Sequence, residues 1–227
     1  AIMDLHDNRV RLNLAGYIMD RSGTQIDFDY VDTNQYLPGT TTPNPTFNLH
    51  TQDTANAPGI SKIRGVEADL TVRPVDNLTL GASYAYTYTM VPVTPNPLLA
   101  INFGKPTAVF TVYTPPNAAS GYIDYSIPVG GESNLRLHLD ANYADAQYSF
   151  QDQSLKTDSS FVVNGRLALT DITLAGNGQK LTVSVWTRNL FNEQHKYRVS
   201  NENAKTLGYY ANFNPPRTFG IEGSINF

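Results

Sequence analysis

Three polar residues on one face of an expected strand have side chains suited to acid–base chemistry. Arg136, His138 and Asp140 occupy every second position of the segment 134–143, so in an extended strand they share a face. A histidine beside a carboxylate can act as a general base, and a hydrolase built on His138 and Asp140 is one alternative. Because no serine in a nucleophile-elbow sequence accompanies the pair, we favour a ladder of ion pairs and hydrogen bonds. We therefore expect no catalytic residue and no enzyme.

The long polar connections between strands hold a second group of candidates. Pro-Asn-Pro occurs at residues 43–45 and 95–97, and His50 lies shortly after the first copy. Aromatic side chains in such connections can contact a flat or amphipathic ligand at a low cost in side-chain entropy. The candidate ligand contacts are Tyr36, Phe47, His50, Phe103, Tyr209, Tyr210 and Phe213. The chain has no cysteine, which excludes thiolate chemistry, and we expect no metal site and no cofactor.

The elements that must position these residues are strands, because apolar and polar residues alternate over segments of about ten positions and helix signals are almost absent. A partial strand at residues 1–5 comes first, and residues 107–113 form a possible brief extra strand. The complete strands are expected at residues 9–30, 62–74, 78–91, 117–128, 134–150, 161–170, 180–198 and 217–227. The sequence therefore predicts an all-β fold.

The connections alternate between short and long. Short turns rich in Asp, Asn and Gly are expected at residues 6–8, 75–77, 129–133 and 175–179, and these residue types suit tight hairpins. Long connections are expected at residues 31–61, 92–116, 151–160 and 199–216. Because every second connection is long, all long loops should leave one end of an antiparallel up-and-down sheet.

Composition narrows the environment of that sheet. Only 16% of the 227 residues are charged, whereas soluble domains average about 25%. The net charge of −4 argues against a nucleic-acid partner. No stretch approaches the roughly 20 apolar residues that a membrane helix needs, so any membrane would be crossed by strands.

The two faces of the expected strands differ sharply. The apolar parity carries essentially no charge, and its aromatics gather near strand ends, where a transmembrane barrel has its interfacial girdles. Lipid on the apolar face and a lumen on the other is therefore the favoured arrangement, and lipid requires a closed barrel. A soluble β-sandwich and a self-contained small barrel remain alternatives. The expected lumen-lining residues are Arg11, Glu67, Asp69, Arg73, Asp124, Arg136, His138, Asp140, Arg166, Arg188 and Glu222.

Two C-terminal segments stand out, Val-Trp-Thr-Arg-Asn-Leu-Phe-Asn-Glu at 185–193 and Pro-Arg-Thr-Phe-Gly-Ile at 216–221. They are similar to the last two strands of TonB-dependent outer-membrane receptors, and the resemblance covers nearly the whole chain. Apolar residues at alternate positions up to a terminal phenylalanine, namely Phe219, Ile221, Ile225 and Phe227, resemble the signal that the outer-membrane insertion machinery reads. The hairpins upstream are compatible with the same family but less specific to it.

The resemblance implies a 22-stranded barrel preceded by a plug domain and a TonB box, with short periplasmic turns and long extracellular loops. Residues 1–227 would be the C-terminal eight or so strands of that one barrel domain, without the plug and the N-terminal strands. The implied function is uptake of a nutrient such as a ferric siderophore across the bacterial outer membrane. The implied partners are outer-membrane lipid, TonB acting through the plug, the missing strands and the insertion machinery. Haem receptors of this family carry an Asn-Pro loop motif near a histidine, but the full motif is not present around His50.

Overall fold

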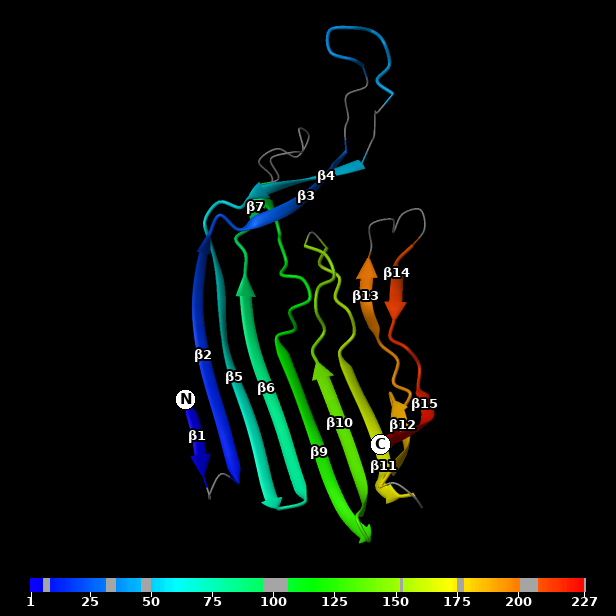
Figure 1. The fold of residues 1–227 in the computed structure, drawn as a ribbon. Coiled ribbons are helices and arrows are strands. Elements are labelled where there is room, and N and C mark those ends of the chain that lie inside the picture. Colours follow the sequence, from blue (N-terminus) through cyan, green and yellow to red (C-terminus); the bar gives the residue numbers. More distant parts are fainter. Residues whose placement is uncertain are drawn as a thin grey trace.

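A single antiparallel sheet forms the body of the molecule (Figure 1). The computed structural model describes residues 1–5, 9–31, 36–45, 50–95, 106–151, 153–174, 178–200 and 208–226. The nine strands of this sheet are β1 Ile2–Leu5, β2 Val10–Ser22, β5 Ile60–Val75, β6 Leu78–Met90, β9 Asn117–Gly130, β10 Ser133–Ala144, β11 Ser160–Thr173, β12 Lys180–Arg188 and β15 Thr218–Asn226.

The strands of the main sheet neighbour one another in chain order, β1-β2-β5-β6-β9-β10-β11-β12-β15, and every pair is antiparallel. This confirms the predicted up-and-down topology and rules out the two packed sheets of a sandwich. In the described part of the chain, β1 pairs with β2 alone and β15 with β12 alone, so the sheet is open. The alternative of a self-contained closed barrel is therefore wrong for these strands. None of the described residues forms a helix long and apolar enough to cross a membrane.

Three further ladders of two strands lie at the loop end of the sheet, where the sequence pattern predicted longer strands or loops. They pair β3 Gln25–Val31 with β4 His50–Asn56, β7 Thr94–Pro95 with β8 Pro106–Thr107, and β13 Lys196–Ser200 with β14 Tyr210–Phe213. The strand expected at residues 9–30 is broken after Ser22, because Gly23 has a positive φ of 64°. Likewise, the strand expected at residues 180–198 ends at Arg188, since Asn189 and Asn192 adopt positive φ.

Two other strand predictions are partly wrong. The strand expected at residues 134–150 ends at Ala144, and beyond it Tyr148 instead forms isolated bridges with Val112 and Lys156. The brief strand expected at residues 107–113 is reduced to the end of β8 and the bridge at Val112. In both segments the alternation continues past the point at which a neighbouring strand is available for pairing.

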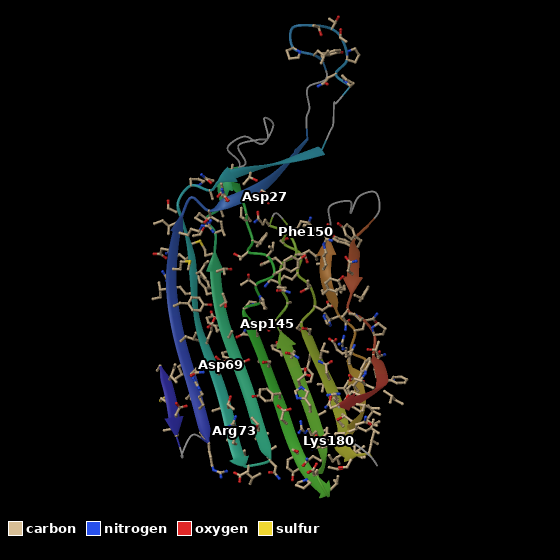
Figure 2. The ribbon with its side chains drawn as sticks, in the orientation of Figure 1. Asp27, Asp69, Arg73, Asp145, Phe150 and Lys180 are labelled. Carbon is tan, nitrogen blue, oxygen red and sulfur yellow. The ribbon has the colours of Figure 1, made fainter. Side chains whose placement is uncertain are left out.

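The two ends of the sheet differ as predicted. The described parts of the short connections lie at one end, and the loops that carry β3, β4, β7, β13 and β14 lie at the other (Figure 1). Arg73 and Lys180 lie toward the short-turn end, whereas Asp27, Asp145 and Phe150 lie toward the loop end (Figure 2). The long loops therefore lie at one end of the sheet, here called the rim, and continue directly from the strands that carry the polar residues.

The apolar face is largely uncovered, because no described part of the chain packs over it as a second layer. Among the described residues only Ile26, Ala57, Ala168 and Val199 are buried hydrophobics. Large apolar side chains on the strands remain exposed, including Ile18 at 79% and Phe219 at 82%. A soluble monomer rarely exposes so continuous an apolar surface, so a hydrocarbon environment accounts for it.

Register corrects one detail of this face. Ile18 pairs with Arg64, and Asp20 pairs with Lys62, so these three charged residues lie on the apolar parity of β2 and β5. The expectation that the apolar parity is essentially free of charge is therefore wrong at the loop end of these two strands. The alternation that placed Val66 on the apolar face also places Arg64 there, two residues earlier, and this signal was present in the sequence.

Candidate functional site on the polar face

The eleven residues expected to line a lumen lie on one face of the sheet, here called the polar face. Register rows connect them across strands: Asp124 pairs with His138, which pairs with Arg166. In the same way, Glu222 lies opposite Ser184. These residues come from strands far apart in sequence, and hairpin pairing brings them into one continuous surface.

His138 lies at the centre of the densest part of the polar face. Its Nδ1 is 2.7 Å from Asp124 Oδ1, and its Nε2 is 3.6 Å from Asp140 Oδ1. Asp140 Oδ2 also accepts hydrogen bonds from the side-chain amides of Asn142, at 2.9 Å, and Asn164, at 2.8 Å. Both nitrogens of the imidazole therefore face carboxylates, which favours the ladder interpretation over a His–Asp base aimed at a nucleophile.

Two arginines extend this ladder. Arg166 donates through Nη2 to Glu222 Oε2 at 3.1 Å and through Nε to Ser184 Oγ at 3.2 Å, so it joins β11, β12 and β15. Arg136 lies 3.8 Å from Asp171, toward the short-turn end. A hollow of about 730 Å³ lies against this part of the face, and its lining includes Asp124, Arg136, His138 and Arg166.

The remaining polar-face residues are less connected. Arg11 lies 4.0 Å from Asp4, and the guanidinium of Arg188 lies 5.7 Å from the ring centre of Trp186. For Glu67 and Asp69 the described part of the chain supplies no ion pair, and they border a second hollow of about 320 Å³. The polar face is thus tightly paired over β9 to β15 and loosely paired over β2 to β6.

Loop aromatics divide into packed and exposed groups. Phe110 stacks on Tyr148 with ring centres 4.2 Å apart, and the Lys156 ammonium lies 4.8 Å from the Tyr148 ring. Arg198 lies 5.0 Å from the ring of Phe150. None of these aromatics was a sequence candidate, because pattern alone does not reveal which loops meet.

The candidate loop residues whose side chains the structure describes lie in two separate segments, the first long loop and the region of β14. Tyr36 lies in the first long loop, forms an isolated bridge with Pro43 and is 54% exposed. Tyr209, Tyr210 and Phe213 are exposed at or beside β14. In Figure 1 the described part of the first loop extends much farther beyond the end of the sheet than β14 does. His50 begins β4, but its side chain, like Phe47, Phe103 and the terminal Phe227, lies outside the described part.

Two carboxylates fasten the loops to the strands at this rim. Asp145 accepts hydrogen bonds from the Tyr143 hydroxyl and from the side chain and backbone of Asn117, and these bonds lower its pKa. Asp158 accepts the backbone N–H of Lys196 at 3.0 Å and lies 3.2 Å from the Lys196 ammonium, which together lower the pKa of Asp158. Both groups are held in their charged form by the contacts that order the rim.

The segment 188–193 forms a hydrogen-bonded turn around Asn189, a buried side chain. Asn189 Nδ2 donates to the carbonyls of Glu193, at 2.7 Å, and Pro215, at 3.2 Å, while its Oδ1 accepts the Glu193 N–H at 2.8 Å. Its own N–H donates to Asn164 Oδ1 at 3.0 Å. The most distinctive motif of the sequence is therefore a structural junction between β11, β12 and the approach to β15.

A wall of antiparallel strands, apolar on one face and ion-paired on the other, with long loops at one end, defines a section of an outer-membrane β-barrel. The chain belongs to the TonB-dependent receptors, because the family described as TonB dependent receptor-like, beta-barrel matches residues 3–190. It is therefore a protein of the bacterial outer membrane. No curated protein matches the sequence significantly.

Solved structures share this architecture. The ferric preacinetobactin receptor BauA of Acinetobacter baumannii is 14% identical with a TM-score of 0.59, over 97% of this chain and 27% of that one. The siderophore receptor PiuA of the same species is 16% identical with a TM-score of 0.63, over 99% and 27%. The ferric yersiniabactin uptake receptor FyuA of Yersinia pestis is 15% identical with a TM-score of 0.64, over 97% and 28%. The chain thus spans about a quarter of the length of these receptors.

Proposed function

We propose that these 227 residues are the C-terminal part of the barrel of a TonB-dependent transporter that takes up a scarce nutrient such as a ferric siderophore. The observation that carries the proposal is the family match over residues 3–190. The three solved receptors named above are siderophore receptors, which supports this ligand class over other nutrients.

In this proposal the two edges of the sheet are joined to strands that lie outside this chain. An open edge in lipid leaves backbone N–H and C=O groups unpaired, at a cost of several kcal/mol for each group. Earlier strands of a 22-stranded barrel would pair with β1 and β15 and close the wall. Residues 1–227 would then be one portion of a single barrel domain, with the plug preceding it.

The polar face would line the lumen and contact the plug, and its paired residues around His138 would give it a fixed shape. The exposed aromatics Tyr36, Tyr209, Tyr210 and Phe213, together with Phe47, His50 and Phe103, would contribute ligand contacts from separate extracellular loops. TonB would act through the plug, and the C-terminal strand would present Phe219, Ile221, Ile225 and Phe227 to the insertion machinery. No catalytic role is assigned to any residue.

The test is uptake of a radiolabelled ferric siderophore panel by cells that carry the complete reading frame, under iron limitation. Uptake that is saturable and lost in cells lacking TonB is the expected result. Accumulation that does not depend on TonB would contradict the transport mechanism. Uptake of a different nutrient, with no uptake of any siderophore in the panel, would contradict the ligand class.

A further inference from the structure

Three charged residues interrupt the apolar face, and they lie together. Arg64 on β5 is flanked in register by Ile18 on β2 and Tyr88 on β6, and the next row holds Asp20, Lys62 and Met90. On the apolar parity of the described strands of the main sheet, Asp20, Lys62 and Arg64 are the charged side chains. We call these three residues the rim cluster.

The rim cluster lies at the outer boundary of the hydrocarbon layer. On β6 the apolar face runs from Leu78 to Tyr88, about 34 Å of strand. At the usual barrel tilt of roughly 40° this spans about 25 Å, the height of the apolar band of an outer-membrane barrel. Arg64, the register partner of Tyr88, therefore lies where hydrocarbon gives way to lipid headgroups.

A column of tyrosines leads up to the cluster. Tyr84, Tyr86 and Tyr88 follow one another on the apolar face of β6 and are all 40–45% exposed. The hydroxyl of Tyr84 donates to Asn117, but those of Tyr86 and Tyr88 have no hydrogen-bond partner in the described part of the chain. Tyrosines in this position place their rings in the interface and their hydroxyls among polar headgroups.

The cluster carries an excess of positive charge. Arg64 Nη2 lies 3.6 Å from Asp20 Oδ1, and both side chains are about half exposed. Lys62 lies opposite the same aspartate, yet it forms no ion pair with any residue the structure describes. Two cations beside one carboxylate leave a net charge of +1, which favours an additional anion.

We propose that Lys62 and Arg64 bind a phosphate group of an outer-leaflet lipid, with the Tyr86 and Tyr88 hydroxyls available to its polar headgroup. Phosphate is the anion found at this depth, and both side chains suit it, Arg through paired N–H donors and Lys as a point charge. The apolar column of Val66, Ala68 and Leu70 below Arg64 receives the acyl chains, so the ligand is a lipid rather than free phosphate. The site is independent of the transported nutrient.

The test measures lipid binding to the complete protein in detergent by native mass spectrometry. The probes are bisphosphorylated lipid A, the same lipid without phosphates, and inorganic phosphate as a competitor. The variants are the double substitution K62Q/R64Q, the single substitutions R64Q and D20N, and a control, R9Q/K180Q. The control removes two cations at the short-turn end of the sheet, where each is ion-paired with Asp76 or Glu132. Heat-modified gel migration checks that every variant forms the barrel.

Wild-type protein should bind bisphosphorylated lipid A more tightly than the dephosphorylated lipid. K62Q/R64Q should weaken that binding about twenty-five-fold, roughly fivefold for each basic residue, while R9Q/K180Q leaves it unchanged. D20N should strengthen it several-fold, because it frees Arg64 and removes a repelling carboxylate. Unchanged binding in K62Q/R64Q would overturn the proposal. Equal effects of D20N and R64Q would show a structural ion pair instead, and displacement by millimolar inorganic phosphate would show a free-anion site.

Discussion

Trp186 on β12 lies directly opposite Gly220 on β15, and the indole occupies the space that a side chain at Gly220 would need. A Cβ added to Gly220 would come within 2.6 Å of the indole ring. The same relationship occurs for Tyr122 across from Gly81, where an added Cβ would also overlap the aromatic ring. Aromatic side chains that cover glycines on the polar face thus fix the packing of neighbouring strands.

Replacing Gly220 by Ala should destabilise the protein by about 1–3 kcal/mol, because the indole or the strand must shift. The matched control is Gly223→Ala on the same strand, where an added Cβ meets no atom within 4 Å. The control should be neutral or slightly stabilising, since glycine is a poor strand residue. Denaturant unfolding of the complete protein measures both, and equal stabilities would contradict this steric role.

Removing the Asn189 side chain should cost about 2–4 kcal/mol. Asn189→Ala leaves the part-buried Glu193 N–H without its acceptor and places alanine at a φ of 52°. Asn189→Gly loses the same hydrogen bonds without the strain, so it should be about 1 kcal/mol less harmful than alanine. The control, Asn134→Ala, removes an exposed hydrogen bond to the Glu132 carbonyl and a side-chain contact with Asp171. Should Asn189→Ala unfold like that control, the junction would not depend on this side chain.

Acid should loosen the loop rim through Asp158. Because the pKa of Asp158 is lowered by the Lys196 N–H and ammonium, its contribution to stability is complete above its usual value of 3.8 and disappears as pH falls through the lowered pKa. Asp158→Asn should therefore be less stable than wild type at neutral pH, by under about 1 kcal/mol for so exposed a pair. Thermal unfolding from pH 7 to pH 2.5 should show this difference shrink toward the acid end. A difference for Asp158→Asn that grows as the pH falls would contradict this prediction.

The orientation of the sheet in lipid can be tested on a single strand. Ile221, on the apolar face of β15, pairs with Val185 and is 79% exposed, whereas Ser224 pairs with Thr182 on the polar face. Ile221→Lys should destabilise the barrel by about 2–4 kcal/mol, the cost of a lysine in mid-membrane, and Ser224→Lys should have little effect. Folding each variant into lipid vesicles and titrating it with urea measures the two free energies of unfolding. A larger effect at Ser224 would mean that the faces are reversed.

Alternation in the sequence was enough to predict the nine strands of the main sheet, their order and the end from which the long loops leave. It succeeded because a strand with one face toward lipid and the other toward polar surroundings must alternate apolar and polar side chains from one residue to the next. It failed where the wall ends, at Gly23 and Asn189, because the alternating pattern continues through positions at which the backbone turns. It also assigned the polar residues to one face of the sheet. It overlooked Arg64, which lies two residues before Val66 and therefore on the same, apolar face.

What the sequence determined by itself is the periodicity: two faces, hairpin connections and a family signature near residue 190. What only the tertiary structure decided is which distant residues meet, such as Arg166 with Glu222, Asp158 with Lys196, and Trp186 over Gly220. The physical reason is that parity assigns a side chain to a face, whereas its partner depends on strand register and on how far each loop folds back. Those are properties of the assembled sheet, so no single strand carries them.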